Sequence, residues 1–141
     1  MSIRQETGAL TVIGTAQISA LGNGTGASAS AFPNGTSANL WIKGGFLFSG
    51  QFGVAPNSGS GLELYLIPSY DGTNYADGNS AIFPLAHYKG TFIARNVTTL
   101  QILSLDDVPL PPVNFLALLV NKGGQTLSGN NFLAFTPIRY Q

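Results

Sequence analysis

Apolar residues occur along this chain in short runs that are separated by turn-forming residues. Between Leu10 and Ser19 alternate positions are apolar, so that Leu10, Val12 and Ile18 would share one face of a half-buried β-strand. The same period of two in Gly61–Pro68 predicts a strand whose two faces are formed by Leu62, Leu64 and Leu66 on one side and by Glu63, Tyr65 and Ile67 on the other.

Six further segments predict strands by the same criteria, namely Ala38–Ile42, Phe46–Val54, Thr91–Ala94, Leu100–Leu105, Asn114–Asn121 and Asn131–Ile138. Gly50 and Gly53 mark a bulge or bend in the second of these segments. Because Asn114–Asn121 is apolar on both faces, we expect it to lie centrally between two layers and to pair with Asn131–Ile138. About eight antiparallel strands, in a chain whose 18 Gly and 8 Pro would interrupt any long helix, predict an all-β jelly-roll or Greek-key β-sandwich made by one domain over residues 1–141.

Two segments lie outside the strand pattern. Residues 22–37 read GNGTGASASAFPNGTS, without a charge, and predict a long flexible surface loop or a segment that becomes ordered against a neighbouring subunit. Residues 1–9 predict an N-terminal arm. Both segments can adapt to a binding partner. Their candidate contact residues are Ile3, Arg4, Phe32 and Pro33.

Charged side chains are scarce: six basic and six acidic residues make up 9% of the chain, against roughly 25% in a typical soluble domain. With one histidine and no cysteine, the chain is also poor in residues that carry protons, act as nucleophiles or bind metals. This composition favours a structural or binding protein over an enzyme. Scattered basic residues and a net charge of zero indicate no nucleic-acid partner. The longest apolar stretch, Phe115–Val120, is far shorter than the roughly 20 residues of a membrane helix, so we expect no membrane partner.

Two polar features are candidates for chemistry, and each has a plainer interpretation. His87 has no second histidine as a partner, which favours a turn or strand-end histidine bonded to backbone or water. Asp71, Asn74 and Asp77 carry oxygen ligands at a spacing that suits calcium, but Asp-Gly is also a common turn dipeptide. We therefore expect no catalytic residue, no cofactor and no bound metal, with these three residues as the alternative calcium ligands.

Two tyrosines, Tyr70 and Tyr75, flank the same loop and are the candidate residues for stacking on a glycan. The alternative interpretation is that the aromatic residues fill the core and its rims, where a polar tip meets water. A carbohydrate-binding or tail- or fibre-associated β-sandwich module is therefore the second functional hypothesis.

Two stretches, Leu62–Asp77 and Val108–Gln141, together resemble a known group of proteins. At the heart of the first, ELYLIPSYDGTNYADG, a strand ends in the pattern Pro-x-x-Asp-Gly-Thr-x-Tyr. In the second, Leu-Pro-Pro leads into a hydrophobic strand, then Asn-Lys-x-Gly-Gln-x-Leu and a last strand that ends in Arg-Tyr-Gln. These motifs resemble small virion proteins that are encoded near the head genes of long-tailed, siphovirus-like phages and that include capsid decoration, or cement, proteins.

The resemblance implies a virion structural protein on the exterior of the phage head, made in the host cytoplasm. Its partner would be the major capsid protein, whose adjacent subunits in the shell it would bind and brace. It would form a homo-oligomer, with a trimer favoured. Its mechanism would be binding without turnover.

Overall fold

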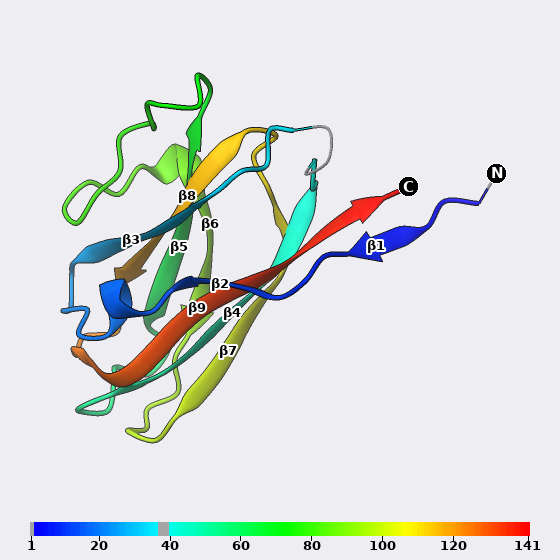
Figure 1. The fold of residues 1–141 in the computed structure, drawn as a ribbon. Coiled ribbons are helices and arrows are strands. Elements are labelled where there is room, and N and C mark those ends of the chain that lie inside the picture. The colour runs from blue at the N-terminus through cyan, green and yellow to red at the C-terminus, as the bar shows by residue number, and fades with distance from the viewer. Residues whose placement is uncertain (1, 37–39) are drawn as a thin grey trace.

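Short strands account for most of the fold in the computed structural model, which describes residues 2–36 and 40–141 (Figure 1). The strands in these ranges are β1 (Gln5–Thr7), β2 (Thr11–Gly14), β3 (Gly26–Phe32), β4 (Lys43–Phe52), β5 (Gly61–Ser69), β6 (Tyr88–Ile93), β7 (Gln101–Pro109), β8 (Asn114–Asn121) and β9 (Leu127–Tyr140). Two single 3-10 turns, η1 (Ala16–Ile18) and η2 (Leu85–His87), follow β2 and precede β6.

The strands form two antiparallel sheets that pack face to face (Figure 1). In the first sheet the order is β2-β9-β4-β7, and β1 pairs with the C-terminal part of β9 on the side away from β4. The second sheet has the order β3-β8-β5-β6. This order from β2 to β9 is that of a jelly roll, in which two Greek keys wrap into a sandwich. The predicted all-β fold class is therefore confirmed, with β1 as an additional strand.

Strands β5 and β8 are buried on both faces. On β8, Phe115 and Leu119 point into the core between the sheets, whereas Leu118 and Val120 point to the outer face of the second sheet. On β5, the core residues are Leu62, Leu64 and Leu66, and the outer-face residues include Tyr65 and Ile67. The chain between β5 and β6 closes this outer face with the side chains of Tyr75 and Phe83. The central position predicted for residues 114–121 is thus confirmed.

Aromatic rings fill the core between the two sheets. Phe135 of β9 stacks on Phe46 of β4, with ring centroids 5.0 Å apart. The same ring meets Phe32 of β3 edge-on at 4.7 Å and Phe115 of β8 at 6.0 Å. Such contacts stabilise beyond the burial of their area, so this cluster holds the two sheets together.

A bulge at Gly50 adjusts the pairing of β4 with β9, as the glycine predicted. The buried side chain of Asn131 fills the space beside Gly50 at this bulge. Its Oδ1 accepts a hydrogen bond from the backbone N–H of Gln51 at 3.0 Å, and its Nδ2 donates to the carbonyl of Ser19 at 3.0 Å. A side chain at position 50 would overlap Asn131 and the ring of Phe48, so the bulge requires glycine.

The prediction of a loop over residues 22–37 is wrong for the central part of that segment. Gly26–Phe32 is the strand β3, which pairs with β8 at the edge of the second sheet. Ala29 is buried in the core, whereas Ser28 and Ser30 are exposed. Burial therefore alternates over residues 27–30, and a bulge between Ser28 and Ala31 interrupts it before Phe32. Alanine and serine differ too little in size and polarity for this alternation to stand out in the sequence.

The strand expected over residues 10–19 is shorter and faces the opposite way. The chain leaves the strand after four residues and turns through η1. Ile13 is buried in the core, whereas Val12 and Leu10 are more than half exposed. The register of β2 against β9 sets this face, because a shift by one residue turns every side chain over. Ile18 still reaches the core, but from the 3-10 turn.

Two further strand expectations differ from the structure. Residues 114–121 and 131–138 do not pair with each other, because β8 lies in the second sheet and β9 in the first. Asn121 fixes the crossing between them, since its Nδ2 donates hydrogen bonds of 2.9 and 2.7 Å to two backbone carbonyls. Of the strand expected over residues 38–42, positions 38 and 39 lie outside the described residues, and residues 40–42 precede β4 without forming a strand.

Alanine at position 50 would place its Cβ against the amide of Asn131 and 2.5 Å from the ring of Phe48. We expect Gly50→Ala to lower the free energy of unfolding by about 1–3 kcal/mol, as overpacking of a core does. Urea denaturation followed by circular dichroism measures this change. Gly45→Ala is the matched control on the same strand, because its Cβ would meet nothing within 4 Å. An equal loss in both variants would contradict the steric explanation.

Candidate functional site

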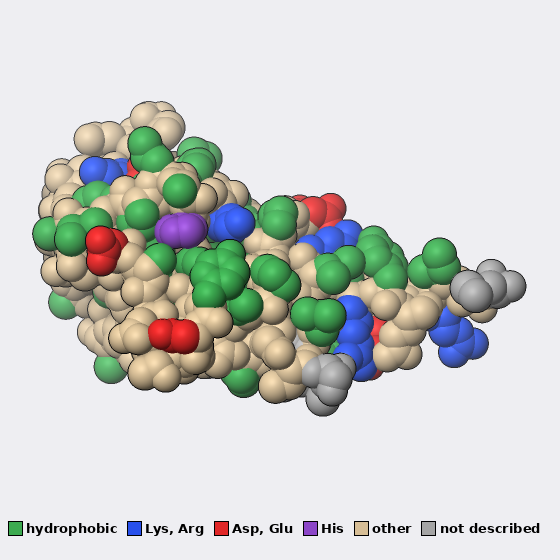
Figure 2. Space-filling view, turned by 90° about the horizontal axis from the view of Figure 1, so that it is seen from above, with side chains coloured by type: hydrophobic (Ala, Val, Ile, Leu, Met, Phe, Trp, Pro, Cys, Tyr) green, Lys and Arg blue, Asp and Glu red, His purple; other side chains and the backbone are tan. Residues whose placement is uncertain are grey.

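A two-stranded ribbon projects from the sandwich, and we define it as residues 2–7 and 138–141. Its register pairs Gln5 with Tyr140, Glu6 with Arg139 and Thr7 with Ile138. Arg4 and Gln141 extend the pairing by two backbone hydrogen bonds of 2.8 Å. Strand β4 accompanies β9 only as far as Ile138. The terminal ribbon therefore reaches beyond the rest of the sandwich, as Figures 1 and 2 show.

Charged side chains hold the two strands of the terminal ribbon together. Arg139 donates from Nε to Oε2 of Glu6 at 2.7 Å, and its guanidinium lies 4.5 Å from the centre of a Trp41 ring. The hydrogen bond from Arg139 lowers the pKa of Glu6 below its ordinary value. Gln141 donates a second hydrogen bond to the same carboxylate oxygen. Glu6 is thus an ionised acceptor that ties β1 to the end of β9.

Lys43 forms an ion pair at the place where the terminal ribbon joins the sandwich. Its Nζ lies 2.7 Å from Oδ1 of Asp107 on β7 and 5.5 Å from the centre of the Tyr140 ring. The hydrogen bond to Asp107 raises the pKa of Lys43 above its ordinary value. Because Asp107 is well exposed, this ion pair orients the side chains more than it stabilises the fold.

Exposed apolar side chains gather along the terminal ribbon and its root. They come from segments beside the C-terminal half of β9, and we call them the apolar ribbon patch: Ile3, Leu10, Val12, Leu40, Ile42 and Tyr140. Their exposed fractions run from 47% to 75%. Figure 2 shows hydrophobic side chains along this projecting end, interleaved with basic ones. Apolar residues that are exposed as a group mark interaction sites, whereas single ones do not.

The four predicted partner contacts fall into two places. Ile3 and Arg4 are exposed on the terminal ribbon. Phe32 is half-buried at the end of β3, where its ring packs against Phe135 in the core. Pro33 follows it and is exposed. The ring of Phe32 is therefore part of the core, and the remaining three side chains are accessible to a partner.

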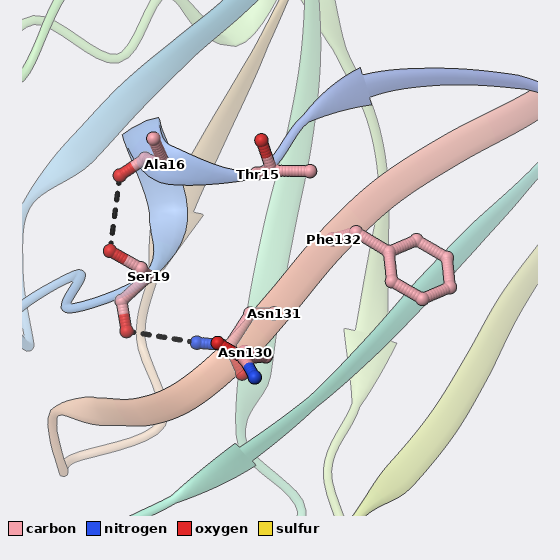
Figure 3. A pocket seen from close by; sticks show the side chains of 6 residues that line it. All are labelled: Thr15, Ala16, Ser19, Asn130, Asn131 and Phe132. Carbon is pink, nitrogen blue, oxygen red and sulfur yellow. Dashed lines mark hydrogen bonds between the residues drawn. The ribbon is translucent and has the colours of Figure 1, made fainter.

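A shallow cleft of about 340 Å³ lies between η1 and β9 (Figure 3). It is lined by Thr15, Ala16, Ser19, Asn130, Asn131 and Phe132. The lining carries hydroxyl and amide groups but no charge, and Ser19 Oγ donates to the carbonyl of Ala16 at 3.1 Å. The cleft can hold a small neutral group, but it brings no acid, base or nucleophile together.

A second cleft, of about 250 Å³, carries the predicted stacking residue Tyr70. The Tyr70 ring is 79% exposed and lies between the end of β5 and residues 35–36. Asn114 and Thr36 contribute an amide and a hydroxyl to the walls. Tyr75, the other predicted stacking residue, is half-buried and packs on the outer face of the second sheet. The two tyrosines therefore form no common platform.

The candidate calcium ligand Asp71 closes a tight turn. Its Oδ1 accepts the backbone N–H groups of Asn74 at 2.7 Å and Thr73 at 2.8 Å, and its Oδ2 accepts Asn74 Nδ2 at 2.7 Å. These N–H donors, with Asn74 foremost, hold the pKa of the Asp71 carboxyl well below its usual range. In residues 2–36 and 40–141, no three His, Cys, Asp or Glu side chains come together in a group that could hold a metal ion.

His87 lies in η2, where its backbone N–H donates to the carbonyl of Pro84 at 2.9 Å. Its side chain is half-buried and lies in none of the clefts described above. The helical segments within the described ranges are single turns, and none of them is long and apolar enough to cross a membrane.

Sequence reasoning missed most of the apolar ribbon patch. It placed Leu10 and Val12 together on one face of a half-buried strand and did not single out Leu40 or Ile42. One signal was present: Ile13 sits on the opposite face of the same alternation, so the segment is apolar on both sides. Because Ile13 is buried in the core between the sheets, Leu10 and Val12 lie on the outer side of the first sheet, where they are exposed.

Comparisons with known proteins identify no family. No family model matches the chain, and no curated protein matches it. One solved structure, described as a carbohydrate-binding module of the β-sandwich superfamily, aligns with 11% identity and a TM-score of 0.34. The alignment covers 99% of this chain and 56% of that one. At this level of similarity the match carries no information about a ligand.

Asp71→Ala would remove the acceptor of the turn, and we expect a lower melting temperature at pH 7. Because folding depresses the pKa of Asp71, its contribution is present above the unfolded value of about 3.9 and is lost as the pH falls through the folded value. The difference in melting temperature from the wild type should therefore shrink below about pH 4. Calorimetry at several pH values tests this, with exposed Asp77→Ala as the control. A difference that does not vary with pH would contradict the explanation.

Proposed function

We propose that this protein is a virion structural protein that decorates the outer surface of a phage capsid. One observation carries the proposal: an apolar ribbon patch on and beside an element that projects from the jelly roll. The motif resemblance in residues 62–77 and 108–141 gives the proposal its partner, the major capsid protein. The protein would be made in the host cytoplasm and would act on the head exterior.

The surface carries few charges, so close approach to another protein removes little hydration from ionised groups. Six exposed apolar side chains supply area that is favourable to bury. A shell repeats the same contact many times, so a modest affinity at each contact suffices for high occupancy where neighbouring contacts reinforce one another. Jelly rolls occur in viral capsid proteins and in lectins alike, so the fold alone does not choose between the hypotheses.

The triple variant Leu10→Ser, Val12→Ser and Ile42→Ser tests this proposal, because it removes half of the apolar ribbon patch and leaves the pairing of β1 intact. We expect its affinity for heads of the encoding phage to fall by about tenfold or more, since each buried methylene contributes about 0.8 kcal/mol. The measurement is co-sedimentation of labelled protein with heads that lack it.

The matched control replaces three exposed apolar residues elsewhere, Val54, Ile82 and Leu85, with serine. This control should bind heads as the wild type does. Equal losses in the two triple variants would contradict docking through the apolar ribbon patch, and absence of the protein from the heads of purified virions would overturn the decoration function itself.

A second candidate function is carbohydrate binding, and the exposure of Tyr70 beside an uncharged cleft is the observation that favours it. Aromatic rings present an apolar face for packing, and the amide and hydroxyl groups of Asn114 and Thr36 can pair with sugar hydroxyls.

Under this second hypothesis, the wild type should give a signal on a glycan array that Tyr70→Ala abolishes, because the stacking surface is gone. Tyr140→Ala is the matched control, since Tyr140 is exposed as well, at 50%, but lies on the terminal ribbon. An array without any signal for the wild type would remove carbohydrate binding from consideration.

A further inference from the structure

The outer edge of β1 is an open strand edge with a defined hydrogen-bond phase. Arg4 exchanges its backbone hydrogen bonds with Gln141 and so directs its N–H and C=O toward β9. Alternate residues of an antiparallel strand direct these groups to opposite sides. Ile3, Gln5 and Thr7 therefore direct theirs away from β9, where no strand in the described part of the chain pairs with them.

This edge matches a second copy of itself. When two β1 strands lie antiparallel about a two-fold axis at Gln5, that residue faces Gln5 of the second copy, and Ile3 faces Thr7 of the second copy. Each of these facing residues directs its backbone groups outward, so the hydrogen bonds can form in both directions. An axis at Arg4 or at Glu6 also brings outward-directed groups together, because it again pairs odd-numbered residues with one another. Only an axis between two residues would set outward-directed groups against inward-directed ones.

The charges on β1 select the alignment with its axis at Gln5. With the axis at Gln5, Arg4 lies opposite Glu6 of the second copy, in a pair where side chains approach closely. An axis at Arg4 or at Glu6 would instead oppose like charges. Glu6 can accept a second cation, because 40% of its side chain remains exposed beside Arg139.

We propose that this chain forms a two-fold dimer through β1, so that the first sheet continues from one molecule into the other. Short, charged edge strands usually resist pairing. Here the charges are self-complementary in one alignment, which permits that pairing and disfavours the others. Pairing also covers Ile3, which is 75% exposed in the single chain. Such an interface is isologous, with the same residues contributed by each copy.

The dimer does not depend on the proposed decoration function. The edge of β1 is distinct from Leu10, Val12 and Ile42, through which head binding is tested. Loss of head binding in that triple variant and loss of dimerisation are therefore separate outcomes. The dimer also differs from the trimer that the motif resemblance implies, and the mass in solution decides between them.

Because the natural chain contains no cysteine, Gln5→Cys provides a direct test on the full-length protein. In the proposed dimer the two Cα atoms at position 5 lie about 5.5 Å apart, within the range that a disulfide spans. We expect mild oxidation, or a two-carbon methanethiosulfonate cross-linker, to convert this variant to a covalent dimer. Light scattering of the wild type should give twice the chain mass of 14.7 kDa at high concentration.

Two single-cysteine variants serve as controls. Thr7→Cys lies on the same strand and face, but the two copies of position 7 would be about four residues apart along the ladder, too far for either cross-link. Ser58→Cys lies on an exposed turn away from the ribbon. Cross-linking of Gln5→Cys that is no faster than that of either control would overturn the proposal, as would a wild-type mass of one or three chains.

The charge pairing has its own test in the Gln5→Cys background. Adding Arg4→Glu should slow dimer formation several-fold, because it opposes two carboxylates across the interface. Adding Arg4→Lys should preserve the rate, since the charge is kept. Equal rates in the two variants would overturn the assigned register.

Discussion

The pairing of β9 with its neighbours is the constraint on which the rest of the structure depends. This strand of 14 residues pairs with β4 along one side and with β1 and β2 along the other. Its inward residue Phe135 anchors the aromatic cluster between the sheets, and Asn131 joins it to the bulge at Gly50. The register of β9 therefore determines which side of β2 is buried. It also determines how far the terminal ribbon extends.

The outer faces of the two sheets differ in how far other segments of the chain cover them. The second sheet is closed by its own chain, since Tyr75 and Phe83 cover the outer residues of β5 and β8. At its β1–β2 end, no segment among residues 2–36 and 40–141 covers the first sheet in this way, and exposed apolar side chains lie there. The protein thus covers the apolar outer face of its second sheet with its own chain and leaves the apolar side chains at the β1–β2 end of the first sheet exposed. This difference unites the proposals for head docking and for self-association, which use neighbouring parts of the same end and share Ile3.

Apolar periodicity predicts the strands correctly where burial makes that pattern strong. It fails where the pairing of distant segments determines which strands are neighbours and which face is buried. Residues 114–121 and the leucine face of β5 follow directly from apolar periodicity. The strand β3 was not predicted because its buried and exposed positions are occupied mainly by alanine and serine, which differ little in polarity. The partner of β9 could not be read locally, because crossing between sheets depends on contacts far apart along the chain, such as Phe32 with Phe135. For the same reason, the apolar ribbon patch emerged only once the register was known.

The single tryptophan of the chain, Trp41, lies beneath the guanidinium of Arg139 where the terminal ribbon meets the sandwich. It is almost fully buried and its carbonyl and N–H are both bonded to Asn34. The molecule therefore carries a built-in optical reporter at the junction between its rigid and its projecting parts. Changes in the fluorescence emission of Trp41 would report binding or movement at the terminal ribbon. Changes at the distant end of the jelly roll would not alter this emission.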